Sequence, residues 1–229
     1  MRLTLFDLDG TLLPIDSDHA FGRALVRAGW ADADDFERRN DVFYADYLAE
    51  RLDLPAYVEF STAPWRDRAE AEAHALRARY IDEDIRPQLH APARALVERH
   101  RAEGDLLAIV TATNEFVTRP IADLFAVEHL LAIELERDAR GRVTGALRGT
   151  PTFREGKIDR VESWLRALGH HRDDFERITV YSDSMNDRPL LEWATHAVAT
   201  NPSASLEALA RERGWPVLRL FEAEQAQQQ

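Results

Sequence analysis

The 229-residue sequence contains no cysteine and almost no lysine. Without cysteine the chain cannot form a disulfide, a cysteine-ligated zinc or iron–sulfur site, or a cysteine nucleophile, and this excludes the cysteine-dependent phosphatases and proteases. Of the 29 basic residues only Lys157 is a lysine, and the other 28 are arginines. We attribute the arginine excess to genome composition rather than to function.

Net positive charge and long apolar runs are also missing. The 41 acidic residues give a formal net charge of −12, which argues against binding to a nucleic-acid backbone, because such binding needs a basic face. The longest uninterrupted apolar run, Leu106–Val110, is far shorter than the roughly 20 residues of a membrane helix. Asp7 and Asp9 interrupt the core of any N-terminal signal peptide. We therefore expect a cytoplasmic protein without nucleic-acid or membrane partners, as a monomer or a homodimer.

Short apolar segments that alternate with helical patterns indicate the fold class. Five segments are typical of buried strands: 2–8, 106–110, 178–181, 194–199 and 216–220. Apolar residues recur at helical spacing over 88–103 and 155–168. This alternation predicts an α/β fold, with a Rossmann-like parallel sheet and helices on both of its faces.

Two stretches depart from this alternation. Residues 16–86 contain no convincing strand and have apolar positions at helical spacing, so we expect an all-helical cap inserted into the core. Residues 130–149 have the pattern of a hairpin with a glycine-containing turn. The predicted domains are therefore a core of residues 1–15 and 87–221 and a helical cap of residues 16–86. The polar tail, 222–229, is predicted to be disordered.

Polar residues follow three of the predicted strands. They are Asp7 and Asp9, then Thr111 and Thr113, and finally Asp183, Asn186 and Asp187. Ligands of open parallel sheets bind beyond the carboxyl ends of the strands. Carboxylates that converge there repel each other unless a cation neutralises them, and an all-oxygen set suits Mg²⁺. Each piece alone has a simpler interpretation as a turn or a helix cap, but their combination in this order favours a site.

Four motifs carry a resemblance to a known family. The segment Phe6-Asp7-Leu8-Asp9-Gly10-Thr11-Leu12 resembles the first motif of the haloacid dehalogenase superfamily. The strand ending in Thr111 resembles the second motif, Lys157 the third, and residues 182–187 the fourth. A helical insertion after the first motif and a hairpin before the third are similar to the phosphoserine-phosphatase-like subfamily. The resemblance extends over nearly the whole chain.

The resemblance implies a Mg²⁺-dependent phosphatase that works through an aspartyl-phosphate. It implies that Asp7 is the nucleophile and that Asp9 is the general acid and then the general base. For Asp9 to be protonated at neutral pH, burial and nearby negative charge must raise its pKa. The same resemblance assigns the metal to Asp7, the backbone carbonyl of Asp9, and Asp183, with Asp187 acting behind these ligands or through a water.

The remaining positions of the motifs would contact the phosphate. Thr111 offers a hydroxyl, and Lys157 offers a compact charge near both the nucleophile and the transferring phosphoryl group. Considered alone, Lys157 is better interpreted as a solvated charge on the first turn of a helix. Where phosphoserine phosphatases resemble Ser-Gly-Gly-Phe after the second motif, this chain has Ala112, Thr113, Asn114 and then Glu115-Phe116. We expect Thr113 and Asn114 to narrow the space beside the phosphate and to contact the leaving group.

The substrate is predicted less directly. In phosphoserine phosphatases an acidic residue nine positions after the nucleophile holds the substrate amino group, and here that position is Asp16. An amino-alcohol phosphate, such as phosphoserine or histidinol phosphate, is therefore the expected small metabolite. The alternative is that Asp16 or Ser17 only caps the first insertion helix. Insertion side chains that are candidates for the pocket, or else for the core, are Trp30, Arg39, Tyr44, Arg51 and Trp65.

Two other functions fit the same scaffold. A phosphotransferase or mutase would pass the phosphoryl group to a second alcohol instead of water. A non-catalytic binding module is disfavoured because both Asp7 and Asp9 are present. For an enzyme, we expect the cap to close over the site about hinges at 12–16 and 84–87.

Overall fold

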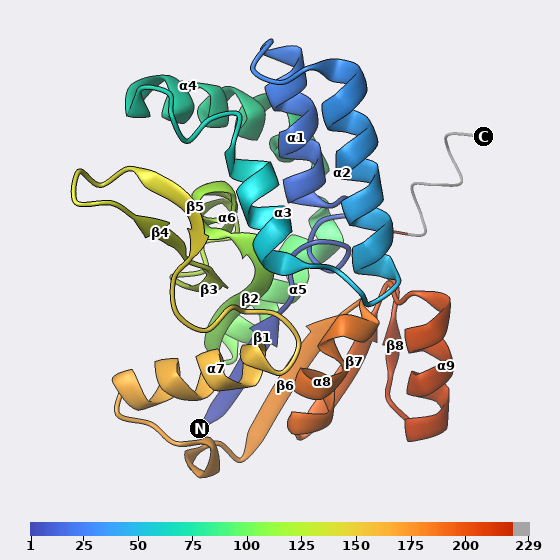
Figure 1. Ribbon diagram of the computed structural model, residues 1–229. Helices are drawn as coiled ribbons and strands as arrows, with labels where there is room; N and C mark the ends of the chain where they lie inside the picture. Colours follow the sequence, from blue (N-terminus) through green and yellow to red (C-terminus); the bar gives the residue numbers. More distant parts are fainter. Residues whose placement is uncertain (222–229) are drawn as a thin grey trace.

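A computed structural model describes residues 1–221 of the chain (Figure 1). Its centre is a six-stranded sheet in the order β3-β2-β1-β6-β7-β8, in which every neighbouring pair is parallel. The strands are β1 (Arg2–Phe6), β2 (Leu106–Asn114), β3 (His129–Ile133), β6 (Arg177–Ser182), β7 (His196–Thr200) and β8 (Val217–Leu218). The central strands are apolar because helices cover both faces of the sheet.

Two buried clusters lie on the two faces of this sheet. On β1, Leu3 and Leu5 point into one cluster, and Phe6 belongs to the other. The face of Phe6 is covered by α5 (Ala91–Ala102) and α6 (Glu115–Leu124). The face of Leu3 is covered by α7 (Gly156–Ala167), α8 (Arg188–Trp193) and α9 (Ala204–Arg213). The predicted α/β fold class is confirmed.

Four α-helices lie within residues 16–86, the stretch that the sequence predicts to be all-helical. They are α1 (Ser17–Arg27), α2 (Ala33–Leu48), α3 (Leu54–Thr62) and α4 (Glu70–Tyr80). The first three begin where an aspartate side chain accepts a backbone N–H bond, at Asp16, Asp32 and Asp53. In Figure 1 the four helices lie beyond the end of the sheet at which β1 continues into α1. The predicted domain boundaries themselves stay a prediction, and the predicted disorder of 222–229 lies outside the described residues.

The hairpin prediction for 130–149 was partly wrong. Residues His129–Ile133 form β3, which pairs in parallel with β2 in the main sheet. The antiparallel hairpin begins only afterwards, with β4 (Leu135–Arg137) and β5 (Val143–Leu147). Glu134 alone separates the two apolar runs, so the alternation of side chains carries no mark of the change from one sheet to the other. Among residues 1–221, every helix is too short or too polar to cross a bilayer.

Candidate active site

The candidate site lies at the carboxyl ends of β1, β2 and β6. Phe6 in β1 is in register with Ile109 in β2 and with Tyr181 in β6. Because these neighbouring strands are parallel and in register, the residues that follow β1 and β6 meet the last residues of β2 at one edge of the sheet. The backbone N–H of Asp7 donates to the carbonyl of Tyr181 at 2.9 Å and holds the first turn against β6.

Lys157 connects two of these strand ends. It lies in the first turn of α7 with only 1% of its surface exposed. Its Nζ donates to Asp7 Oδ1 at 2.9 Å and to Asp187 Oδ2 at 2.7 Å. Burial alone would lower the pKa of Lys157, but these two carboxylates raise it above its ordinary value, so the amine stays charged. The interpretation of Lys157 as a solvated surface charge is therefore wrong.

Asp187 holds the lysine rather than a helix end. One of its oxygens accepts from Lys157 and also from the hydroxyl of Ser182, at 2.8 Å. It precedes α8 but makes no side-chain cap bond to that helix, so the capping interpretation of Asp187 is wrong. In the preceding turn it is Ser184 that accepts the backbone N–H of Asn186.

Asp7 is buried, and its proton affinity reflects opposing influences. Burial raises the pKa of Asp7, Lys157 lowers it, and Asp187 and Asp9 raise it again, to about 7. Any further positive charge beside this carboxylate would favour its ionised, nucleophilic form.

The donor set fits a divalent cation. Asp7, Asp183 and Asp187 bring three carboxylates together with a single ammonium group, that of Lys157. Burial and the charges of Asp7 and Asp187 raise the pKa of Asp183 well above its ordinary value. Carboxylate and carbonyl oxygens, including the carbonyl of Asp9, are the ligands that Mg²⁺ prefers.

Gly10 permits the close approach of Asp183. Its φ is +73°, and a Cβ at this position would overlap the Asp183 carboxylate. Thr11 donates its hydroxyl to Asp183 Oδ1 at 2.9 Å, which fixes the other side of the same carboxylate. The turn after β1 therefore positions an acid that comes from β6.

A second group of potential ligands lies elsewhere. Ligand atoms of His100, Glu103 and Asp105 lie within 4.8 Å of one another, in the segment that enters β2 rather than the one that leaves it. Arg2 forms ion pairs with Glu103 and Asp105, so part of their negative charge is already compensated within the protein.

Asp9 has the surroundings that an acid–base residue needs. Its Oδ1 accepts from the backbone N–H of Ser17 at 2.8 Å, and its Oδ2 accepts from the hydroxyl of Thr113 at 2.8 Å. Burial and the nearby Asp16 raise the pKa of Asp9 to about 7, although the two hydrogen bonds oppose this. A group with this pKa can both donate and accept a proton at neutral pH.

The last four residues of β2 divide into two parts. Thr111, Ala112 and Thr113 line the cavity above Asp7. Thr111 Oγ1 accepts from the backbone N–H of Thr113 at 3.1 Å, so its own hydrogen can be donated to a ligand. Asn114 instead caps α6 through Val117 and does not line the cavity, contrary to the expected contact with the leaving group.

The cavity above Asp7 has about 550 Å³ of space not occupied by atoms, a volume that includes its opening to solvent. The inserted helices supply its upper wall. Asp16 accepts the backbone N–H of His19 at 2.8 Å, so the capping interpretation is correct, and yet its carboxylate also faces the cavity. Of the five candidates from the insertion only Tyr44 lines the cavity, whereas Trp65, for example, stacks on Phe116 in the core.

Sequence reasoning missed most of this upper wall. Asp18, which lies close to Asp16 in the sequence, is also in the lining, and the lining residues that sequence reasoning did not select are His19, Asn40, Phe43, Tyr47, Leu52, Leu54 and Tyr57. The available signal was the aromatic row on α2, in which Phe43, Tyr44 and Tyr47 follow one another on one side of the helix.

Comparisons with known proteins agree with this geometry. The family model described as haloacid dehalogenase-like hydrolase matches residues 4–192. The chain is 39% identical over 217 residues to a histidinol-phosphatase from Neisseria meningitidis, which covers 95% of this chain and 98% of that protein. It is 32% identical over 222 residues to phosphoserine phosphatase SerB1 from Mycobacterium tuberculosis, covering 93% of this chain and 68% of that protein.

Solved structures give the same result for the fold. A protein of unknown function from Bordetella pertussis Tohama I superposes with a TM-score of 0.91 at 45% identity, covering 96% of this chain and 99% of that one. A substrate-bound phosphoserine phosphatase superposes with a TM-score of 0.67 at 15% identity, over 94% of this chain and 91% of that one. The second likeness concerns the fold alone.

Replacing Lys157 with Met tests the buried ion pairs. We expect the metal-free variant to lose about 3–5 kcal/mol of unfolding free energy at pH 8, because two buried carboxylates lose their counter-charge. The folded-state pKa of Asp7 then rises further above its unfolded value, so the loss grows with rising pH and shrinks as pH falls to 5.5. Urea unfolding at both pH values measures this. The control Arg86→Met removes an exposed ion pair with Asp82 and should lower the free energy of unfolding by at most about 1 kcal/mol. If the Lys157 variant loses the same free energy of unfolding at both pH values, the account is contradicted.

Replacing Gly10 with Ala tests how Asp183 is positioned. We expect Mg²⁺ affinity, measured by calorimetry, to fall at least about tenfold, because the new methyl group displaces the Asp183 carboxylate. The matched control is Gly29→Ala, since Gly29 has a φ of +70° but nothing within 4 Å of a Cβ. In both variants an alanine at positive φ lowers the free energy of unfolding by about 1–3 kcal/mol. Only the Gly10 variant should bind Mg²⁺ more weakly. Equal affinities in the two variants would show that Gly10 does not shape the metal site.

Proposed function

The chain belongs to the haloacid dehalogenase-like hydrolase family and is a phosphoric monoester hydrolase, and from its site we propose that it uses Mg²⁺ and an aspartyl-phosphate intermediate to hydrolyse a small phosphorylated amino alcohol. The observation that carries the proposal is the pair Asp7 and Asp9 in one cavity. Asp7 is paired with Lys157, and Asp9 has a pKa of about 7. These are the properties of a nucleophile and of a proton donor, respectively.

In the first step a carboxylate oxygen of Asp7 attacks the phosphorus atom, and the bond from phosphorus to the substrate alcohol breaks. Asp9 donates its proton to the departing alkoxide, so the alcohol leaves neutral. Lys157 Nζ, which lies 2.9 Å from Asp7 Oδ1, offsets negative charge on the nucleophile and on the transferring group. The alkoxide of an amino alcohol is a poor leaving group, which is why the acid is needed.

In the second step Asp9, now ionised, removes a proton from water, and the resulting hydroxide attacks the phosphorus of the aspartyl-phosphate. The bond from phosphorus to the Asp7 oxygen breaks, inorganic phosphate leaves, and both aspartates return to their starting states. Thr111 donates its hydroxyl to a phosphate oxygen. Mg²⁺, held by Asp7, the carbonyl of Asp9 and Asp183, would supply positive charge to the phosphoryl oxygens, while Asp187 keeps Lys157 in place.

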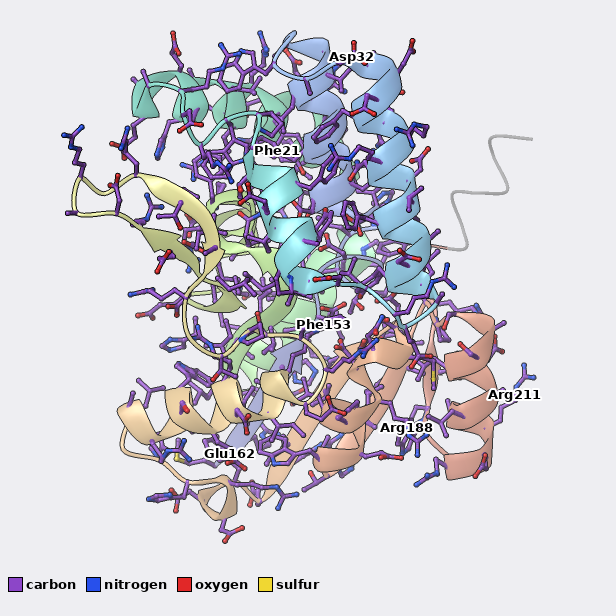
Figure 2. The ribbon with its side chains drawn as sticks, viewed as in Figure 1. Phe21, Asp32, Phe153, Glu162, Arg188 and Arg211 are labelled. Atoms are coloured by element: carbon purple, nitrogen blue, oxygen red, sulfur yellow. The ribbon has the colours of Figure 1, made fainter. Side chains whose placement is uncertain are left out.

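We further propose that residues 16–86 act as a cap that closes the cavity. The end of α2 is tied to the core where Asn186 Nδ2 donates to the carbonyl of Tyr47 at 2.9 Å. Arg154 donates to Asn186 Oδ1 and to the carbonyl of Glu50. Phe153, labelled in Figure 2 on the loop between β5 and α7, lies with its ring centroid 6.3 Å from that of Tyr47. These contacts support a closed arrangement that excludes water during the first step.

The upper wall supports an amine-bearing substrate. Asp16 and Asp18 both line the cavity and offer negative charge to an ammonium group. Two relatives are named for phosphates of amino alcohols, histidinol phosphate and phosphoserine. No observation on the described residues favours transfer to a second alcohol, and the cytoplasmic location stays a prediction.

Replacing Asp7 with Asn tests the nucleophile. We expect phosphate release from para-nitrophenyl phosphate in Mg²⁺ to fall at least about a thousandfold, because the amide cannot form the intermediate. The wild-type protein should lose activity in EDTA and regain it when Mg²⁺ is restored, and excess glycerol should yield little transfer product. Circular dichroism serves as the check on folding. A folded Asp7 variant that retains activity would disprove the assignment.

Replacing Asp9 with Asn tests the acid. The kcat/KM for an alkyl ester such as ethanolamine phosphate should fall about 10²–10⁴-fold, whereas para-nitrophenyl phosphate should lose much less, since nitrophenolate leaves without a proton. In the wild-type protein the alkyl rate should decline above pH 7, because the acid with a pKa of about 7 then loses its proton. Equal losses for both esters would argue against Asp9 as the proton donor.

A further inference from the structure

The part of the cavity that the inserted helices form has negative charge without a counter-ion. Asp18 is 8% exposed, and its Oδ1 lies 3.4 Å from Asn114 Nδ2, a weak neutral contact. Tyr57 donates its hydroxyl to the same carboxylate. Asp16 receives only backbone N–H bonds. Among residues 1–221, no basic side chain lies within ion-pair distance of either acid, in contrast to Asp7 with its lysine.

Burial of these acids has a measurable cost. Burial and the charge of Asp16 raise the pKa of Asp18 to about 7, and burial also raises the pKa of Asp16. A cation placed between the two carboxylates would lower both values and recover the cost of desolvation. Arg23 lowers the pKa of Asp16 without forming an ion pair with it, and no basic group lowers that of Asp18, so a positively charged ligand would complete the wall.

The nitrogen-containing side chains of this wall are already committed to other partners. Arg23 Nη1 lies 2.9 Å from His19 Nδ1 and can only donate, so His19 Nδ1 accepts. His19 Nε2 therefore carries the hydrogen and donates it to Asp41, also at 2.9 Å. Asn40 Nδ2 donates to the carbonyl of His19. His19 therefore has no nitrogen donor left over for an anionic group on the substrate, and Asn40 keeps one neutral N–H, which carries no positive charge to balance a carboxylate.

Aromatic rings make up the rest of the wall. Phe43 and Tyr44 from α2 and Tyr57 from α3 line the cavity together with two leucines. Phe43 and Tyr57 meet edge to face with their ring centroids 5.4 Å apart, which leaves an apolar surface beside the acids. Aromatic faces attract cations and stack with flat rings, but they offer nothing to a carboxylate.

We propose that this wall selects phosphorylated amino alcohols whose amine-bearing carbon carries a ring and no carboxylate, with Asp18 as the residue that sets the preference. The inference rests on the proposed function and extends it to the substrate class. The ammonium group lies between Asp16 and Asp18, and the ring lies against Phe43, Tyr44 and Tyr57. A substrate carboxylate would enter a cavity that already holds four aspartates and would find no basic partner, which opposes its binding.

Three compounds test this preference in the wild-type protein. Ethanolamine phosphate, O-phosphoserine and histidinol phosphate share the phosphate and the amine, and they differ in one substituent on the amine-bearing carbon: hydrogen, carboxylate or imidazolylmethyl. We expect kcat/KM to be at least about tenfold higher for histidinol phosphate than for ethanolamine phosphate, and lower again by at least about tenfold for O-phosphoserine. A value for O-phosphoserine equal to or above that for ethanolamine phosphate would overturn the inference.

The variant Asp18→Asn tests the assignment to a residue. It keeps the shape of the side chain and removes its charge, so the ratio of kcat/KM for ethanolamine phosphate to that for para-nitrophenyl phosphate should fall at least about tenfold. The penalty on O-phosphoserine should shrink in the same variant. The control Asp35→Asn removes an exposed charge on α2 that pairs with Arg38, and it should leave both ratios unchanged. An unchanged ratio in a folded Asp18 variant would remove Asp18 from the proposal.

The two proposals fail in different ways. If para-nitrophenyl phosphate is hydrolysed but O-phosphoserine is the preferred amine, the phosphatase proposal stands and the substrate inference fails. If no ester is hydrolysed, the phosphatase mechanism fails, and calorimetric binding of the same three phosphates to the Asp7→Asn protein decides the inference. Binding of O-phosphoserine as tight as that of ethanolamine phosphate would overturn it, and the predicted order of affinities would support it.

Discussion

The buried ion pairs of Lys157 with Asp7 and Asp187 are the interaction on which the candidate site depends. They join three segments that lie far apart in the chain: the end of β1, the start of α7 and the turn after β6. None of the three side chains is more than 7% exposed, so each is stable there only because the others are present. A guanidinium is a broad planar fork and does not replace a compact ammonium between two carboxylates, which gives a reason for the single lysine in this arginine-rich chain.

The balance of charge divides the cavity into two halves. Around Asp7, one ammonium group faces three carboxylates, which leaves two negative charges uncompensated. A divalent metal ion would balance them. Asp16 and Asp18 form no ion pair within the described protein, and only the charge of Arg23 acts on Asp16, so the remaining negative charge matches the amine of the proposed substrate. Asp9 lies between the halves, where Asp16 helps to raise its pKa. The acids that attract the substrate amine therefore also contribute to the protonation of the catalytic acid.

The sequence predicted the core better than the upper wall of the cavity, for a physical reason. Parallel strands buried on both faces are short apolar runs, and the chemical residues must follow their ends, so Asp7 and Asp183 could be selected. Lys157 lies in the first turn of α7 and was selected only through its resemblance to the third motif. Helical spacing identifies the inserted helices but does not distinguish an aromatic ring in the core from one at a cavity. Tyr57 was missed for this reason. β3 was assigned to the hairpin because β3 and β4 are adjacent apolar runs with the same pattern of side chains.

The central claim is that a phosphoryl group passes through Asp7, and trapping it is the most direct test. The wild-type protein is mixed with a substrate labelled in its phosphoryl group, quenched in acid during turnover, and digested for mass spectrometry. The account predicts the label on the peptide that contains Asp7, with a lifetime set by hydrolysis. Steady release of labelled phosphate with no label on the protein, or a label on another residue, would contradict it.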